Sequence, residues 1–254
     1  MVEFNAERGK YWMHTADLLR PLDADIVILN EMDIGMARSD QQHTTRLLAF
    51  ALGMNYAWAV EFMELTRGTK AEQDDTKGSY NFLGLHGNAI LSRCPLVDPV
   101  VFRDPIGDYF SASSNNVNAK GYEQRLGGRM ALFTRVKLPF ATVAVASVHK
   151  ISGHVKSMQT YINSTPSRLA IVAGDQHWGY CSSVGLVHAD KRDHYTWPAS
   201  CSSLGKQRGD IICCSSSMAV TVPERSFLPC LKTQWGVSMH ISDHAPTLVT
   251  VAIH

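Results

Sequence analysis

Residues 26–31 read IVILNE, a run of four aliphatic side chains followed directly by an amide and a carboxylate. A short run in which every side chain is apolar is typical of a strand whose sheet is covered on both faces. Ligands of open α/β sheets bind in the crevice beyond the strand ends, so Asn30 and Glu31 stand where a site is expected. This segment therefore predicts both a covered sheet and a functional carboxylate, Glu31, at the end of one strand.

Four other apolar segments carry polar residues at their ends in the same manner. They are residues 144–148 followed by His149, residues 169–173 followed by Gly174 and Asp175, residues 211–214 preceded by Asp210, and residues 248–253 preceded by Asp243 and His244. A single such residue is usually a solvated strand end, but a set of carboxylates and imidazoles predicts a shared cleft. Carboxylates bind hard cations such as Mg²⁺, and imidazoles move protons near neutral pH or stabilise developing negative charge.

The intervening segments predict a few helices among many strands. Helical spacing of apolar side chains, alternation and turn residues indicate the type of each element. The predicted elements are helices over residues 9–19, 40–52 and 155–162, a hairpin over residues 130–136 and 141–148, and loops over residues 64–81 and 103–124. Hairpins together with interspersed helices favour mixed sheets over a purely parallel one.

The composition is that of a globular protein without a strong overall charge. Of 254 residues, 45% are hydrophobic and 19% are charged, which excludes wholesale disorder. No repeat or linker divides the chain, so we expect one domain over residues 1–254, and we expect a monomer. The 24 basic and 23 acidic side chains nearly cancel, which argues against tight nonspecific binding to DNA. No apolar run approaches the roughly 20 residues of a membrane span, so we expect no transmembrane segment.

The cysteines and the first residues favour a reducing compartment. Residues 1–4 (MVEF) have neither the basic nor the apolar region of a signal peptide. The six cysteines include no CxxC pair, so we expect reduced thiols, with Cys213 and Cys214 on a buried strand. The expected location is cytoplasmic, and secretion or an organelle is the alternative if an upstream segment has been removed.

Eight segments spread over nearly the whole chain form an ordered set of motifs. They are, in order, Phe4-Asn5, residues 29–31 (LNE), 86–93 (HGNAILSR), 127–129 (GGR), 147–149 (SVH), 174–177 (GDQH), 208–212 (RGDII) and 242–246 (SDHAP). Each is weak alone, but their order resembles that of the endonuclease/exonuclease/phosphatase superfamily, the fold of pancreatic deoxyribonuclease, neutral sphingomyelinases and inositol polyphosphate 5-phosphatases. The resemblance implies a four-layer α/β sandwich, in which two packed mixed β-sheets are flanked by helices.

The resemblance further implies a phosphoester hydrolase that depends on Mg²⁺, with Mn²⁺ as an alternative. Glu31 is implied as the principal metal ligand, with Asn5 and Asp243 beside the ion, directly or through water. Mg²⁺ usually keeps several waters and takes one or two carboxylates together with phosphate oxygens, which suits so small a ligand set.

The remaining strand-end residues are implied to act on the phosphate and on water. His149 would hydrogen-bond a phosphate oxygen, and Asp175 would orient or deprotonate the attacking water. Asp210 would fix the tautomer of His244 and raise its basicity, as a carboxylate orients a triad histidine. Asp175 and His244 both stand as candidates for the general base.

Two positions depart from the superfamily pattern. His177 replaces the asparagine that contacts the scissile phosphate, and we expect its imidazole to donate the corresponding hydrogen bond. Only four residues precede Asn5, so we expect the first strand to be truncated. Near the motifs, we expect Arg129 to form a pair inside the fold. Two roles are open for His86, which either lines the cleft or holds a turn.

The sequence leaves the substrate class open. Small phosphodiesters, lipid head groups, phosphoinositides and short nucleic acids all suit a nearly neutral chain, and the fold does not choose among them. The alternative of a different class is a binding or scaffold protein that kept the fold and lost catalysis at His177.

Overall fold

The computed structural model describes residues 1–104, 124–177, 179–189, 196, 209–222, 229–232 and 238–253. The loop predicted over residues 103–124 lies almost wholly outside these residues, and so does Arg208 of the seventh motif. The strand ends on which the predicted site depends all lie within the described ranges.

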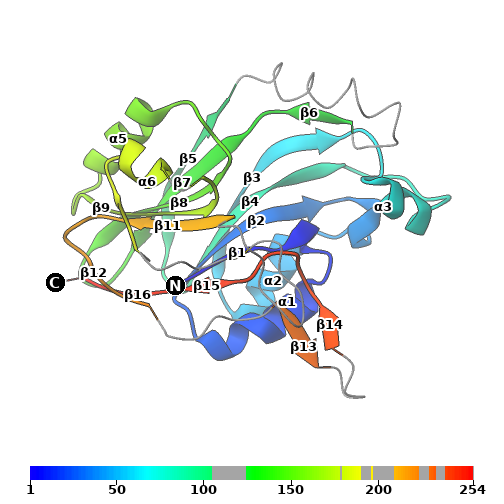
Figure 1. Ribbon diagram of the computed structural model, residues 1–254, viewed down its shortest axis with the longest axis horizontal. Helices are drawn as coiled ribbons and strands as arrows, with labels where there is room; N and C mark the ends of the chain where they lie inside the picture. The colour runs from blue at the N-terminus through cyan, green and yellow to red at the C-terminus, as the bar shows by residue number, and fades with distance from the viewer. Residues whose placement is uncertain are drawn as a thin grey trace.

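Two six-stranded sheets form the centre of the fold (Figure 1). The first contains, in spatial order, β15 (Thr247–Leu248), β1 (Val2–Asn5), β2 (Ile26–Ile34), β4 (Leu85–Ser92), β3 (Asn55–Glu64) and β6 (Arg125–Gly127). The second contains β10 (Val187–His188), β11 (Asp210–Cys214), β9 (Leu169–Asp175), β8 (Thr142–His149), β7 (Met130–Lys137) and β5 (Leu96–Arg103). β1 and β2 are parallel, as are β8 and β9, and the other neighbours are antiparallel. The prediction of mixed sheets and of a β7–β8 hairpin is confirmed.

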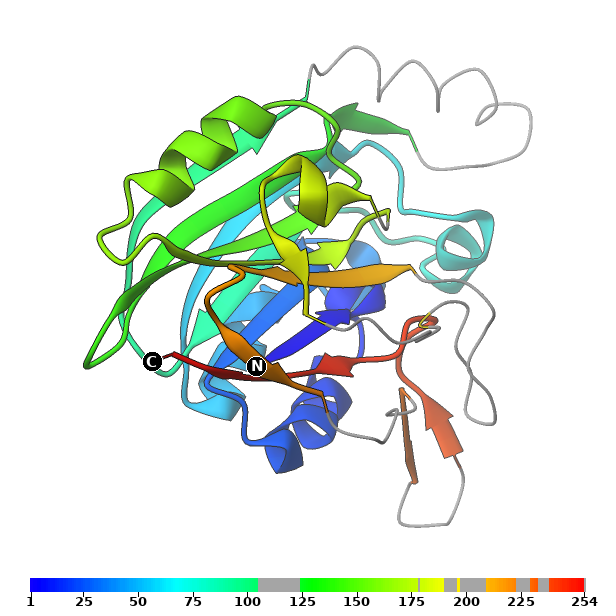
Figure 2. The ribbon, with the colours of Figure 1, turned by 60° about the vertical axis from the view of Figure 1, so that its left-hand side comes forward.

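Helices cover the outer face of each sheet and complete four layers (Figure 2). The helices are α1 (Trp12–Leu19), α2 (Thr44–Leu52), α3 (Lys70–Asp75), α5 (Val155–Asn163) and α6 (Tyr180–Ser183), with 3-10 turns η1 (Glu7–Gly9), η2 (Arg20–Leu22) and η3 (Ala37–Ser39). Of these helices, α3 contributes no residue to the apolar cores. α1 and α2 pack on the first sheet, and α5 and α6 pack on the second. A third apolar core lies between the sheets, so the predicted four-layer sandwich is confirmed.

The apolar run in β2 follows from these layers. Val27 and Leu29 pack with α1 and α2, whereas Ile26 and Ile28 face the core between the sheets. β1 also forms, although only four residues precede its end, because it pairs with β2 on one side and β15 on the other. Four residues therefore suffice for a strand inside this sheet.

The remaining elements lie at the edges of the sandwich. β12 (Ala219–Thr221) pairs with β16 (Thr250–Ala252), and β13 (Cys230–Lys232) pairs with β14 (Ser238–His240). The last predicted strand, residues 248–253, is thus divided between β15 and β16. The predicted loop over residues 64–81 contains α3, which begins with a capping box. Within the described ranges, no helix has the length and apolar character needed to cross a bilayer.

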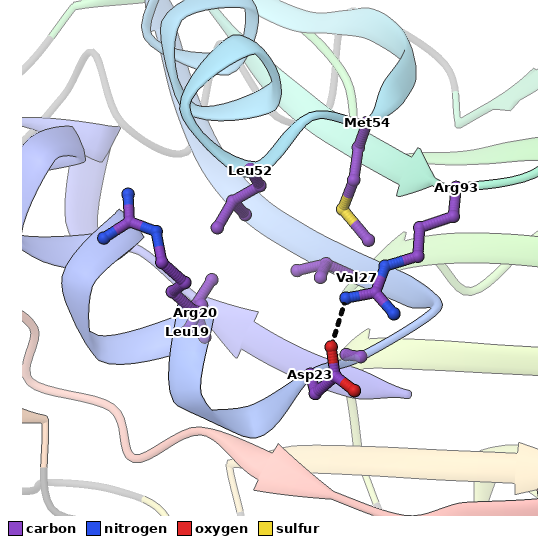
Figure 3. A pocket seen from close by; sticks show the side chains of 8 residues that line it. Leu19, Arg20, Asp23, Val27, Leu52, Met54 and Arg93 are labelled. Atoms are coloured by element: carbon purple, nitrogen blue, oxygen red, sulfur yellow. Dashed lines mark hydrogen bonds and ion pairs between the residues drawn. The ribbon is translucent and has the colours of Figure 1, made fainter.

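A small hollow lies between α1, α2 and β2, at the opposite end of β2 from Glu31 (Figure 3). Leu19, Val27 and Leu52 line its apolar side, and an ion pair between Asp23 and Arg93 closes its rim. Its volume of about 40 Å³ has room for little more than ordered water. This end of the strand therefore serves packing.

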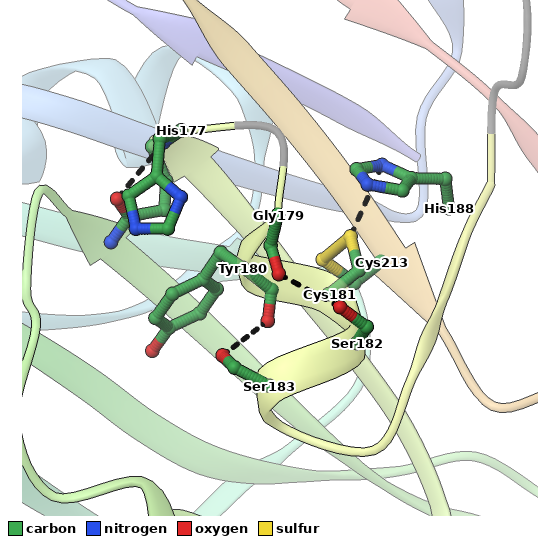
Figure 4. The surroundings of a disulfide bond; sticks show 9 residues. His177, Gly179, Tyr180, Cys181, Ser182, Ser183, His188 and Cys213 are labelled. Carbon is green, nitrogen blue, oxygen red and sulfur yellow. Dashed lines mark hydrogen bonds between the residues drawn. A yellow bond between two sulfur atoms is a disulfide. The ribbon is translucent and has the colours of Figure 1, made fainter.

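The expectation of reduced thiols is wrong for Cys181 and Cys213, which form a disulfide between α6 and β11 (Figure 4). Side chains alternate along β11, so Cys213 faces α6 while Cys214 faces the core between the sheets and stays a free thiol. The two Cα atoms lie 5.3 Å apart, a separation typical of a disulfide. The helix that brings Cys181 to this strand is a tertiary feature, which cysteine spacing does not reveal.

Removing this disulfide is expected to lower the free energy of unfolding by roughly 3 kcal/mol, because it closes a long loop in the unfolded chain. The bonded residues are 32 positions apart. Urea unfolding of Cys181→Ala/Cys213→Ala measures the effect, and Cys94→Ala, a free thiol, serves as the control. Equal unfolding midpoints for the wild type with and without reductant would contradict this expectation.

Candidate active site

Glu31 projects from an irregularity in β2. The register between β2 and β4 shifts between Leu29 and Met32, and Glu31 has a φ of 59°, in the left-handed region. Bulges and backbone strain of this kind re-aim side chains at functional sites. Parallel pairing of β1 and β2 places Asn5 opposite Asn30, and Asn5 Nδ2 donates to Glu31 Oε1 at 3.3 Å. Two of the predicted metal ligands are therefore neighbours.

The segment before β15 closes over the end of β1. Ser242 Oγ donates to the Asn5 carbonyl at 2.7 Å and accepts a hydrogen bond from the His244 amide at 3.1 Å. The Asp243 amide donates to Glu7 Oε2 at 3.0 Å. These contacts hold Asp243 and His244 at the strand end that carries Asn5.

His244 and Asp210 form the predicted pair. His244 Nδ1 lies 2.8 Å from Asp210 Oδ2, and both side chains are buried. Burial disfavours the charged imidazolium, but the Asp210 carboxylate outweighs burial and raises the pKa of His244 to about 9. Asp210 also lies opposite Asp175 in the β11–β9 pairing, so this pair adjoins the next predicted residue.

Asn30 ties together strand ends from both sheets. Its Nδ2 donates to the Val148 carbonyl at 3.0 Å, and its Oδ1 accepts from the Asp175 amide at 2.7 Å. A Cβ atom on Gly174 would lie 1.9 Å from the Val148 oxygen and 2.7 Å from Asn30 Oδ1. Only glycine fits at this close approach, so Gly174 and Asn30 together fix the position of Asp175.

His149 ends β8 and is held by a buried carboxylate. His149 Nδ1 lies 2.7 Å from Glu61 Oε2, and Arg129 Nη1 donates to Glu61 Oε1 at 2.7 Å. Burial disfavours the charge on Glu61, but His149 and Arg129 outweigh burial and lower the pKa of Glu61 to about 2. Arg129 therefore pairs inside the fold, as expected, and its partner Glu61 orients the imidazole.

Asp175 faces the imidazole of His149 and the ammonium group of Lys150. His149 Nε2 lies 3.5 Å from Asp175 Oδ2, and Lys150 Nζ lies 3.1 Å from the same oxygen. Burial opposes the charged carboxylate, but His149 and Lys150 outweigh burial and lower the pKa of Asp175. Asp175 is therefore ionised at neutral pH and able to accept a hydrogen bond from water.

Glu61→Gln is expected to lower the free energy of unfolding at pH 7 by roughly 3 kcal/mol. The folded pKa of Glu61 is about 2, below its usual value of 4.5. Its stabilising effect is therefore present above about pH 4.5 and lost as the pH falls toward 2. Denaturant unfolding at several pH values measures it, with the exposed Asp17→Asn as control. If the difference in free energy of unfolding between the wild type and Glu61→Gln stayed constant down to about pH 3, the lowered pKa of Glu61 would be contradicted.

The structure brings seven of the eight predicted residues to one edge of the sandwich, linked as described above: Asn5, Glu31, His149, Asp175, Asp210, Asp243 and His244. His177 is different, because its imidazole is exposed and lies edge-on against Tyr180, with ring centroids 6.0 Å apart (Figure 4). In the part of the chain that the structure describes, no hydrogen bond or ion pair joins this ring to the other seven. Its contact with a phosphate stays a prediction.

Arg8, Glu61 and Lys150 also belong to this site and were not predicted, and Asn30, which was expected at the site, was given no role there. Asn30 and Lys150 directly adjoin predicted residues, so their positions were a usable signal. Glu61 lies within β3, which no pattern indicated. The His86 side chain is fully buried, and its Nδ1 lies 2.7 Å from Asp33 Oδ1, so His86 pairs inside the fold.

Comparisons with known proteins identify the fold that carries this site. No family model and no curated protein matches the sequence. An endonuclease/exonuclease/phosphatase from Beutenbergia cavernae superimposes with a TM-score of 0.63 at 17% identity, over 98% of this chain and 70% of that one. An endonuclease/exonuclease/phosphatase family protein from Leptotrichia buccalis gives a TM-score of 0.61 at 15% identity, over 99% of this chain and 98% of that one. A mannosyl-6-phosphatase from Bacteroides thetaiotaomicron gives a TM-score of 0.58 at 14% identity, over 99% of this chain and 98% of that one. The chain has the endonuclease/exonuclease/phosphatase fold.

This fold implies a divalent metal, and the donors at Glu31 suit one. The Arg8 guanidinium already lies against Glu31 Oε2, so the carboxylate is placed to receive positive charge. Burial opposes ionisation of Glu31, but Arg8 and nearby imidazoles outweigh it and hold the pKa of Glu31 well below its usual range. Carboxylate and amide oxygens are ligands that Mg²⁺ prefers. Among the described residues, no three carboxylate, imidazole or thiol side chains form a ready-made metal cage.

Proposed function

We propose that this protein is a phosphoester hydrolase that uses Mg²⁺ or Mn²⁺. The observation that carries the proposal is the convergence of Glu31, Asp175 and the Asp210–His244 pair at one edge of the two sheets. Asn30 couples the two sheets at that edge. The mannosyl-6-phosphatase of the same fold supports phosphoester chemistry in general. The substrate of this chain is a separate question.

Glu31 would hold the metal, with Asn5 and Asp243 beside it. When bound, a divalent cation polarises the phosphoryl group and stabilises the leaving oxygen. Glu31 contributes a full negative charge at a position fixed by the β2 bulge, and the amide of Asn5 supports its orientation. Asp243 is placed beside them by the Ser242 and Glu7 contacts.

The other residues bind the phosphate and prepare water. Asp175 accepts a hydrogen bond from the attacking water and orients it, because its own backbone is fixed by Asn30. Glu61 holds Nδ1 of His149. Nε2 of His149 lies 2.9 Å from Arg129 Nη1 and 3.5 Å from Asp175 Oδ2, so Nε2 would donate to a phosphate oxygen in place of these contacts. Asp210 fixes the ring of His244, which leaves Nε2 as the nitrogen that acts on the reaction. Asp175 and His244 are the two candidates for accepting the proton from water. Because the pKa of His244 is raised to about 9, its imidazole can accept a proton only in its deprotonated form, which predominates above that pH.

A panel of phosphoesters tests this function. A small phosphodiester, a sugar phosphate, a lipid head-group ester, a phosphoinositide and a short oligonucleotide are each incubated with Mg²⁺, Mn²⁺ or EDTA. We expect hydrolysis of at least one ester with metal and none with EDTA. If neither the wild type nor His177→Asn cleaves any ester, the binding or scaffold alternative replaces the enzyme.

The cysteines support an oxidising compartment for this hydrolase, in place of the cytoplasm expected from the sequence. Cys181 and Cys213 are bonded to each other, and Cys230 is also disulfide-bonded. Disulfides persist in secreted, periplasmic and lumenal proteins and are rare in the cytosol. Thiol labelling of protein isolated from its source, before and after reduction, tests this assignment. Full labelling of Cys181 and Cys213 before reduction would contradict it.

A further inference from the structure

Arg8 lies between two carboxylates, and one of them is Glu31. Its Nη1 contacts Glu31 Oε2, and its Nε lies 3.5 Å from Glu72 Oε1 on α3. The three side chains are between 15% and 17% exposed, so water screens these contacts only weakly. Asn5 donates to the other oxygen of Glu31, so both carboxylate oxygens have partners.

The backbone is built to hold Arg8 in this place. Glu7, Arg8 and Gly9 have φ values of 43°, 74° and 61°, so three successive residues adopt the left-handed conformation. Non-glycine residues reach it only when the surroundings impose it. The Glu7 amide donates to Asn5 Oδ1 at 3.1 Å, and a Cβ on Gly9 would lie 2.7 Å from Thr44 Oγ1. The backbone of this turn therefore fixes Arg8 against Glu31.

Glu72 is a fixed second partner for Arg8. Its Oε2 accepts from the Thr69 amide at 2.6 Å, as part of the capping box of α3. The same oxygen lies 3.3 Å from Arg38 Nη1, and two hydrogen bonds hold Arg38 on Asp33. The remaining oxygen of Glu72, Oε1, is the one near Arg8. The Arg8 guanidinium can therefore leave Glu31 and pair with Glu72 without a rearrangement of α3.

We propose that Arg8 is a positioning residue that sets the metal affinity of Glu31 by competing with the cation for Oε2, and that Glu72 receives Arg8 when the metal binds. This inference rests on the proposed function. A guanidinium and a divalent cation repel each other at one carboxylate oxygen, so the metal must displace this contact. In the absence of metal, Arg8 and Asn5 hold the Glu31 carboxylate in place.

The proposal predicts opposite effects for two charge-removing changes. Arg8→Met removes the competitor, so the dissociation constant for Mn²⁺ should fall about tenfold, the size of one charge-assisted hydrogen bond. Glu72→Gln removes the receiving charge but keeps a side chain able to cap α3. It should therefore raise the dissociation constant severalfold. In the Arg8→Met background, Glu72→Gln should have little further effect, because no arginine is left to redirect.

Isothermal titration calorimetry with Mn²⁺ and with Mg²⁺ measures these affinities without any substrate. Arg20→Met and Asp74→Asn are the matched controls. Arg20 is an exposed cation that pairs with Asp17, and Asp74 is an exposed carboxylate on α3 that pairs with Lys70. If the effects came from net charge alone, these controls would reproduce them. We expect neither control to change the affinity by more than about twofold, since exposed charges are screened.

The outcomes separate this inference from the proposed function. A wild type that binds neither cation overturns both. If the wild type binds metal, either of two results overturns the inference alone. One is that Arg8→Met binds the metal as strongly as the wild type or more weakly. The other is that Glu72→Gln changes the dissociation constant equally in the wild-type and Arg8→Met backgrounds. Circular dichroism checks the fold of each variant. If Arg8→Met does not fold, Glu72→Gln still tests the inference, because unchanged or tighter metal binding by that variant contradicts it.

Discussion

Glu31→Gln is expected to lower the rate of phosphoester hydrolysis at least about 100-fold, because loss of a central electrostatic group costs roughly 3 kcal/mol or more in the transition state. Glutamine keeps the shape of the side chain and can still accept the hydrogen bond from Asn5. The fold should survive, since Glu31 belongs to none of the apolar cores. The measurement is kcat/KM with the preferred metal, together with the melting temperature.

Asp17→Asn is the control for this variant, because Asp17 is an exposed carboxylate that pairs with Arg20. It should leave the rate unchanged. If Glu31→Gln were well folded and worked within about threefold of the wild-type rate, Glu31 would not be the metal ligand, since such a loss amounts to well under 1 kcal/mol.

His244→Ala, Asp210→Ala and the double variant are expected to lose similar amounts of activity, each about 100-fold or more. Asp210 acts through the ring of His244, since its Oδ2 lies 2.8 Å from His244 Nδ1. Removing either residue therefore disables the same unit, and removing the second adds little. A double-mutant cycle on kcat/KM gives the coupling.

The exposed pair Asp17 and Arg20 provides the matched cycle. Its members also form an ion pair, at 2.8 Å, but both side chains are exposed, Asp17 on α1 and Arg20 on η2. Neither change nor their combination should alter the rate. Cleanly additive losses at Asp210 and His244 would show that the two residues act independently, which contradicts their assignment as one unit.

Strands could be predicted from the sequence where both faces are buried, because every side chain in such a strand is apolar. The run at residues 26–29 is wholly apolar because α1 and α2 cover one face and the second sheet covers the other. The polar residues that end such runs were also predictable, because strand ends gather at one edge. Pairing of β1 with β2 then brings Asn5 to Glu31, as the motif order implied.

β3 escaped prediction because its burial is uneven. Its first half is exposed or half-buried, and Glu61 and Glu64 put carboxylates at buried positions where an apolar pattern would be expected. Both carboxylates are satisfied by arginines that come from other strands or turns. Only the tertiary structure reveals those partners, so Glu61, the residue that holds His149, could not be identified from its own segment.

α3 and the disulfide were missed for different reasons. Thr69 and Glu72 have the spacing of a capping box, which is a readable helix start, but the surrounding polar residues favoured a loop. The pairing of Cys181 with Cys213 depends on how α6 packs against β11, and no local spacing encodes that contact. The first error was avoidable, and the second needed the structure.

Hydrolysis measured before, during and after removal of divalent metal tests the central claim most directly. The best ester from the panel is assayed with the protein as purified, then in saturating EDTA, and then after dialysis into Mg²⁺ or Mn²⁺. We predict that EDTA abolishes hydrolysis and that either cation restores it for the wild type but not for Glu31→Gln. Undiminished hydrolysis by the wild type in saturating EDTA would contradict the claim that this site works through a metal held by Glu31.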